Sequence, residues 1–327
     1  MSRIYEALQK AESERKLERR EPEPREPEQP ISTGMIAATA VAEPEESLLP
    51  PPPVPYWDTP AAPVVGDSPD LGKIVARPWS PSLVQLPALA ERGPAVEQFR
   101  SLRSRIFELR DINPLKTILV SSGLPQEGKS FVSTNLALSL ARHKNSRVLL
   151  IDGDMRRYTL HQILGCESNP GLADYLAGKA SALEVMQRPT QSPVATPGAG
   201  SGSGVATGPV LPNLTFIAGG NGGDKAADLS GSPRFGELIR MAAPHFDWII
   251  VDSSPVLPVS DAVNLARSCD GVLLVARAGV TKFPVAQRAQ SELKASHILG
   301  FVLNAVLEAP ELGGYYGYGY GYETKSQ

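Results

Sequence analysis

The sequence predicts an α/β fold in which a mostly parallel β-sheet is covered by helices on both faces. Between residues 93 and 308, short apolar runs alternate with helical patterns, which is typical of parallel strands joined by crossover helices. Within this region the segment GLPQEGKS, from Gly123 to Ser130, separates one apolar run from one helical pattern. The composition on either side is strongly biased, so we expect one folded domain between disordered extensions.

The N-terminal part of the chain is predicted to lie outside this domain. Residues 1–20 have the pattern of a short amphipathic helix, with Ile4, Leu8 and Ala11 on one side. Such a helix is marginal alone, so it either docks on another surface or frays in solvent. Residues 21–92 include the runs EPEPREPEQP and LPPPPVPYW, which predict a disordered polyproline II linker.

The domain begins with a helix predicted from Pro94 to Arg110. Residues 188–213 interrupt the later alternation and are rich in Gly, Ser, Pro and Ala, which predicts a flexible surface insertion. The predicted strands are Lys116–Ser122, Arg147–Ile151, Leu214–Ala218, Asp247–Asp252, Gly271–Ala276 and Ile298–Asn304.

Residues 309–327 form a tail of alternating Gly and Tyr, which cannot build a core and should be disordered. The tail tyrosines are Tyr315, Tyr316, Tyr318, Tyr320 and Tyr322.

Composition narrows the possible classes of protein. The net charge of −3 over 327 residues gives no reason to expect nucleic-acid binding. Two cysteines do not make a disulfide framework, so the cytosol is the expected compartment. We find no apolar run of about 18 residues, so no membrane-spanning helix is predicted.

The segment GLPQEGKS matches the phosphate-binding loop, or P-loop, which reads Gly, four residues, then Gly-Lys-Ser/Thr. Its glycines let backbone N–H groups point at phosphate oxygens, beside the positive end of the next helix. Lys129 is expected to reach the β- and γ-phosphates, and the Ser130 hydroxyl to bind Mg²⁺. The residues predicted to bind ATP are Gly123, Gln126, Glu127, Gly128, Lys129, Ser130 and Asn304.

Three aspartates stand where apolar runs end. Asp152 and Asp154 follow one run, and Asp252 ends another. Ligands sit outside the carboxyl ends of parallel strands, so the three carboxylates are expected to converge on one nucleotide with its Mg²⁺. Asp252 fits the Walker B role of holding the metal. Each aspartate alone is also a common turn or cap residue.

The tail tyrosines are candidate phosphoryl acceptors. A tyrosine hydroxyl that attacks a γ-phosphate needs an acidic group to orient it, and either Asp152 or Asp154 could accept its proton. The alternative is a low-complexity tail without a catalytic role.

With these pieces the chain resembles the bacterial BY-kinases, the tyrosine autokinases of exopolysaccharide and capsule synthesis. The resemblance covers about residues 94–322 and rests on SSGLPQEGKS, LLIDGDMRR, the segment Ile249–Ala262, EQFRSLR and the tyrosine cluster. The opening MSRIYEALQKAE is similar to the start of stand-alone cytoplasmic members. The sequence departs from the family at Gln126, where relatives usually have Gly, and in the long insertion. It also has Ser-Ser-Pro after Asp252, where Thr-Pro-Pro is commoner.

The resemblance implies an ATP- and Mg²⁺-dependent protein-tyrosine kinase that phosphorylates its own tail in trans within an oligomer. It implies catalytic roles for Lys129, Asp152, Asp154 and Asp252, and a Mg²⁺ site made by Ser130, Asp154 and Asp252.

The resemblance also implies partners. Glu97, Arg100 and Arg103 match the motif through which one subunit contacts the next in a ring, although Glu97 and Arg100 alone also fit a plain surface pair. The other implied partners are a transmembrane activator of the chain-length-regulator type and a cognate tyrosine phosphatase. The implied location is cytoplasmic and peripheral to the inner membrane, through a partner.

Two other functions are weighed against this one. A partitioning or cell-division ATPase of the deviant-Walker class carries a second Lys after the first loop Gly, where this chain has Leu124. A non-catalytic nucleotide-binding interaction protein does not need the complete set of Lys and Asp residues that this chain retains.

Overall fold

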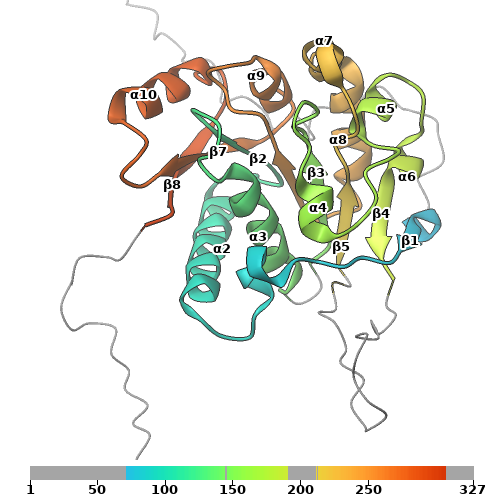
Figure 1. The fold of residues 1–327 in the computed structure, drawn as a ribbon, viewed down its shortest axis with the longest axis horizontal. Helices are drawn as coiled ribbons and strands as arrows, with labels where there is room; N and C mark the ends of the chain where they lie inside the picture. Colours follow the sequence, from blue (N-terminus) through green and yellow to red (C-terminus); the bar gives the residue numbers. More distant parts are fainter. Residues whose placement is uncertain (1–70, 144–145, 191–210, 212, 307–327) are drawn as a thin grey trace, which may run out of the picture. The chain divides into compact units, whose positions relative to one another are not determined.

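The computed structural model describes residues 71–143, 146–190, 211 and 213–306, which form an eight-stranded sheet with helices on both faces (Figure 1). The strands are β1 (Val75–Arg77), β2 (Thr117–Ser122), β3 (Val148–Asp152), β4 (Met186–Pro189), β5 (Leu214–Ile217), β6 (Trp248–Asp252), β7 (Gly271–Arg277) and β8 (Ile298–Asn304). The α-helices are α2 (Pro94–Ile112), α3 (Lys129–Ala141), α4 (Leu160–Leu164), α5 (Leu172–Leu176), α6 (Ala182–Val185), α7 (Ala226–Ser230), α8 (Pro233–Ala242), α9 (Asp261–Ala266) and α10 (Phe283–Glu292). Short 3-10 turns are η1 (Leu71–Lys73), η2 (Leu83–Gln85), η3 (Pro87–Leu89) and η4 (Gly223–Lys225).

The strand order in the sheet is β1-β4-β5-β3-β6-β2-β7-β8. From β5 to β8 every neighbouring pair is parallel, whereas β4 runs antiparallel to β5 and β1 lies parallel to β4. The six predicted strands are confirmed, each with ends within one residue of the expected positions. The P-loop-type arrangement is confirmed too, because β2 leads through the loop directly into α3.

Strand residues alternate between two hydrophobic cores, one on each face of the sheet. On β6, Trp248 and Ile250 pack with α2, α3 and α4, while Ile249 and Val251 pack with α5, α8 and α9. Because both faces are covered, all five β6 residues are buried, as expected of a central parallel strand.

The expectation that the disordered linker extends to residue 92 is wrong for its last part. From residue 71 onward the chain forms turns and the edge strand β1, and it buries Trp79, Leu86 and Ala88. The buried side chain of Asn135 on α3 holds this segment: its Oδ1 accepts the Ala88 N–H at 3.0 Å, and its Nδ2 donates to the Gln85 carbonyl at 3.0 Å. Proline-rich composition excludes regular helices and central strands, but it does not prevent irregular chain from packing against a helix.

The predicted insertion is also shorter than expected. β4 includes Arg188 and Pro189, and Leu211 is buried in the core on the α2–α3 face. The pattern does not predict β1 or β4, because β1 has three residues and β4 ends on a proline.

The expected N-terminal helix (1–20), the linker up to residue 70, most of the insertion and the tyrosine tail lie outside the described residues. Within the described part of the chain, no helix combines the length and the hydropathy needed to cross a bilayer.

Candidate nucleotide site

The P-loop curls tightly between β2 and α3. Gly128 has a φ of +94° at the start of α3, and a Cβ there would lie 1.9 Å from the Nδ2 atom of Asn304. Only glycine fits both the backbone angle and this close approach. The Asn304 amide in turn donates to the Glu127 carbonyl at 3.0 Å, so the end of β8 supports the loop.

Gln126 also lies in the left-handed region, with a φ of +64°. This is the position where the sequence departs from the family's usual glycine, and a residue with a Cβ has a higher conformational energy than glycine in this region. The strain is retained because the loop is fixed on both sides of Gln126: the Leu124 N–H donates to a Glu127 carboxylate oxygen at 2.8 Å, and Thr281 donates its hydroxyl to the other.

Glu127 is therefore a buried brace of the loop, with an exposed fraction of only 3%. The sequence predicts it among the ATP-binding residues, but the structure shows its carboxylate turned to Leu124 and Thr281.

Two residues at and just after the carboxyl end of β7, Arg277 and Thr281, also support this loop, and the sequence does not predict either of them. The Thr281 hydroxyl bonds Glu127 and also accepts the Arg277 N–H, and an Arg277 guanidinium nitrogen lies 3.5 Å from the Gln126 carbonyl. The rule that ligands gather at the carboxyl ends of parallel strands could have pointed to them.

The two acidic strand ends converge on the loop. Asp152 and Asp252 are direct neighbours in the β3–β6 pairing. The Ser130 hydroxyl donates to Asp252 Oδ2 at 2.6 Å, and Lys129 Nζ lies 3.2 Å from Asp154 Oδ2. The structure thus brings together four predicted site residues, Lys129, Ser130, Asp154 and Asp252, from two strand ends and one helix start.

Asp152 has a different environment from the other two aspartates. It is completely buried, and its two oxygens accept the backbone N–H groups of Asp154 at 3.2 Å and Leu160 at 3.1 Å. Burial, and then the negative charge of Asp252, raises the pKa of Asp152 well above its usual range. These contacts make Asp152 the residue that shapes the turn on which Asp154 is presented.

Lys129 is the positive charge of the site. Burial by itself would lower the pKa of Lys129, but the carboxylates of Asp252 and Asp154 outweigh that effect and raise it. Lys129 therefore stays protonated at neutral pH and can bind an anion such as a phosphate group. Burial raises the pKa of Asp252, although Lys129 and the Ser130 hydrogen bond act in the opposite direction.

The Asp252 carboxylate fits a metal ion. Its Oδ1 atom is buried and has no hydrogen-bond partner, which is costly for an oxygen unless something binds there. Mg²⁺ prefers oxygen ligands and is typically held by one or two carboxylates, with phosphates and water supplying the rest. The described residues contain no cluster of three His, Cys, Asp or Glu side chains that could hold a metal by themselves.

The predicted oligomer-contact residues lie elsewhere, on α2. Arg100 pairs with Glu97 at 2.5 Å, and Arg103 donates to the Ser139 carbonyl at 2.7 Å. They are not part of the nucleotide site. The tail tyrosines lie outside the described residues, so their role stays a prediction.

Comparison with known proteins places this chain and its fold in a family. The chain is 31% identical over 224 residues to the tyrosine-protein kinase YwqD of Bacillus subtilis, a match that covers 68% of this chain and 86% of that protein. The chain belongs to the BY-kinases. No protein-family model matches it. A solved BY-kinase structure, the kinase domain of the Escherichia coli tyrosine kinase ETK, superimposes with a TM-score of 0.56 at 29% identity, covering 69% of this chain and 80% of that one.

Some BY-kinases are much longer than this chain. The putative tyrosine-protein kinase EpsB of Ralstonia solanacearum is 37% identical over 185 residues, which is 56% of this chain but only 22% of EpsB. The chain thus spans about a fifth of the length of that relative.

Proposed function

We propose that this BY-kinase is an ATP-dependent protein-tyrosine kinase that phosphorylates its own C-terminal tyrosines in trans, within an oligomer. We further propose that this activity regulates the synthesis or export of an exopolysaccharide or capsular polymer. The observation that supports the reaction best is the convergence of Lys129 and Ser130 with Asp154 and Asp252, at 3.2 Å and 2.6 Å. The arrangement places the buried ammonium group of Lys129, which can bind phosphates, beside the Ser130 hydroxyl and the Asp252 carboxylate, which can bind a metal ion.

Each residue has a distinct role in the proposed reaction. Lys129 would bind the β- and γ-phosphates of ATP, with the loop N–H groups of Gly123 to Ser130 around them. Ser130 and Asp252, already in contact, would hold Mg²⁺, and Asp154 would take part in the proton transfer instead. When bound, Mg²⁺ neutralises the charge that builds up on the transferred phosphoryl group.

The base that accepts the tyrosine proton is better assigned to Asp154 than to Asp152. Both oxygens of Asp152 are used by backbone N–H groups, and its side chain is completely buried. Asp154 presents its Oδ2 to the same space as the Lys129 ammonium group, where the phosphoryl group would lie. The tyrosine hydroxyl attacks phosphorus, the bond to the leaving oxygen of ADP breaks, and the phenol proton passes to the carboxylate.

The proposal extends to partners on the strength of the sequence resemblance. These partners are a transmembrane activator of the chain-length-regulator type, further copies of this chain in a ring contacted through Glu97, Arg100 and Arg103, and a cognate tyrosine phosphatase. Through the activator the protein would be peripheral to the inner membrane on its cytoplasmic side.

The test is mass spectrometry of the tail after incubation of purified protein with Mg-ATP, with and without the cytoplasmic segment of a candidate activator. Wild type should gain phosphotyrosine between Tyr315 and Tyr322, and Lys129→Met should gain none. Lys294→Met, an exposed lysine on the chain after α10, is the matched control and should behave as wild type. Phosphotyrosine that persists in Lys129→Met contradicts the proposal. ATP hydrolysis without tyrosine phosphorylation would favour a partitioning-type ATPase, and ATP binding without turnover a non-catalytic role.

A further inference from the structure

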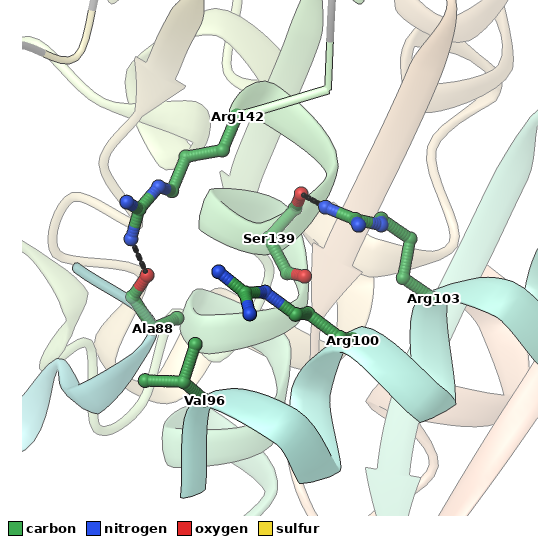
Figure 2. A pocket seen from close by; sticks show the side chains of 6 residues that line it. All are labelled: Ala88, Val96, Arg100, Arg103, Ser139 and Arg142. Carbon is green, nitrogen blue, oxygen red and sulfur yellow. Dashed lines mark hydrogen bonds between the residues drawn. The ribbon is translucent and has the colours of Figure 1, made fainter. Parts of the chain in front are cut away.

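Three arginines surround a pocket that the nucleotide site does not use. The pocket has a volume of about 240 Å³ and lies between η3, α2 and the end of α3. Figure 2 shows the guanidinium of Arg100 extending between Arg142 on one side and Ser139 on the other, with Arg103 beyond it. We call it the arginine pocket; its lining residues are Ala88, Val96, Arg100, Arg103, Ser139 and Arg142.

The positive charge of the arginine pocket is only partly compensated. Arg142 donates to the carbonyls of Ala88 and Ala90 at 2.6 and 2.7 Å, and Arg103 donates to the Ser139 carbonyl at 2.7 Å. These bonds to neutral carbonyls fix the side chains without removing their charge. Of the six described residues that line the pocket, none is acidic.

The arginines affect one another. Burial, followed by the positive charges of Arg100 and Arg142, lowers the pKa of the Arg103 guanidinium. Arg100 has an acidic partner, Glu97, but that pair is exposed at the rim of α2. Backbone carbonyls hold Arg103 and Arg142, and the exposed Glu97 holds Arg100, so three guanidinium groups gather around one cavity. An anion there is favourable, and a doubly charged anion suits three guanidinium groups better than a single carboxylate does.

We propose that the arginine pocket binds a phosphate monoester, and that its occupant is phosphotyrosine from the C-terminal tail. A phosphate group offers three acceptor oxygens to the guanidinium donors, and the buried Val96 provides an apolar wall for the phenyl ring. This rests on the proposed function, because the proposed reaction is what makes phosphotyrosine on this chain.

The tail is long enough to reach the pocket. The end of β8 contacts the loop at the start of α3, through Asn304, and the pocket lies near the other end of α3, about 20 Å along a helix of this length. Tyr315 follows Val306, the last described residue, by nine positions and Tyr322 by sixteen. Extended chain spans at most about 30 Å and about 55 Å over those lengths.

The consequence is a product-sensing site. Arg100 and Arg103 also belong to the motif proposed to contact the next subunit. A phosphotyrosine that occupies them would withdraw both arginines from that contact, so phosphorylation would weaken the ring by competition for the same side chains as well as by repulsion between charged tails.

The test uses full-length Lys129→Met protein, treated with a tyrosine phosphatase, so that neither catalysis nor an occupied tail interferes. A fluorescent peptide of residues 313–327 phosphorylated at Tyr318 is titrated by anisotropy, with the unphosphorylated peptide as a second arm and inorganic phosphate as a competitor. The phosphopeptide should bind, and Arg142→Gln or Arg103→Gln should weaken it about tenfold or more. Arg105→Gln, which is on the exposed side of α2 and outside the pocket, should change nothing.

Several results would overturn the proposal. They are equal binding of both peptides, equal losses in Arg105→Gln and Arg142→Gln, and competition by inorganic phosphate at the concentration at which the phosphopeptide itself binds. A change in sedimentation of Arg142→Gln with no change in peptide binding would assign the pocket to a neighbouring subunit instead. Circular dichroism confirms that each variant is folded. Because the peptide is synthetic and the protein catalytically disabled, failure here leaves the kinase proposal standing, and failure of that proposal leaves this measurement valid.

Discussion

Replacing Gln126 by glycine should stabilise the folded domain. Gln126 is held at a φ of +64° by the braced P-loop, and a left-handed conformation costs a residue with a Cβ roughly 1–2 kcal/mol. The greater freedom of glycine in the unfolded chain offsets about 0.5–1 kcal/mol of this. The expected net gain is about 0.5–1 kcal/mol, which corresponds to a rise in Tm of roughly 1–4 °C for a domain of this size.

Two controls separate backbone strain from side-chain effects. Gln126→Ala keeps the strain and should leave the free energy of unfolding nearly unchanged. Gln98→Gly makes the same chemical change on the exposed side of α2 and should destabilise by about 0.8–1 kcal/mol. Urea unfolding followed by tryptophan fluorescence measures all three, since Trp79 and Trp248 are buried. If Gln126→Gly is destabilising by as much as Gln98→Gly, the loop does not store the strain described here.

The other predictions concern binding, stability and pH. Gly128→Ala places a Cβ 1.9 Å from Asn304 Nδ2 at a positive φ and should weaken ATP binding at least about tenfold; an unchanged Kd in a fluorescent-nucleotide titration would contradict this. Asn135→Ala leaves the buried Ala88 N–H unpaired and should destabilise by about 2–4 kcal/mol in urea unfolding, and a loss under about 0.5 kcal/mol would show that the segment before α2 is not docked. Burial raises the pKa of Asp152, so the folded state holds its proton more tightly than the unfolded state does, and stability is lost as the pH rises from the usual carboxyl range through that raised pKa. Asp152→Asn should therefore flatten the decline in unfolding free energy as the pH rises above about 4, and an unaltered slope would show that Asp152 is not its source.

The central sheet could be predicted because its strands bury both faces. Runs such as those of β2 and β6 are continuously buried and end at chemically informative residues, so their positions follow from the sequence alone. The edge of the sheet could not be predicted in the same way. β1 and β4 are held mainly by pairing with each other and with β5, a tertiary property that leaves little trace in a three- or four-residue stretch.

The candidate site shows the same division. Lys129, Ser130 and Asp252 could be assigned because a local motif or a strand end marks each of them. The bracing of Glu127 by Thr281 joins residues far apart in the chain, and no local pattern carries that information. Distinguishing Asp152 from Asp154 likewise required knowing that backbone N–H groups occupy both oxygens of Asp152 but only Oδ1 of Asp154, whose Oδ2 faces Lys129.

The position of β1 has a consequence for how the domain assembles. β1 comes before every other described strand in the chain, yet its partner β4 lies beyond α2, α3 and β3 in the sequence. During synthesis from the N-terminus, Val75 has no strand to pair with until Gln187 has emerged, and joining them closes a long loop at an entropic cost. β1 itself can therefore pair only after the P-loop, its helix and the strand carrying Asp152 have emerged, whereas Gln85 and Ala88 need only Asn135 of α3.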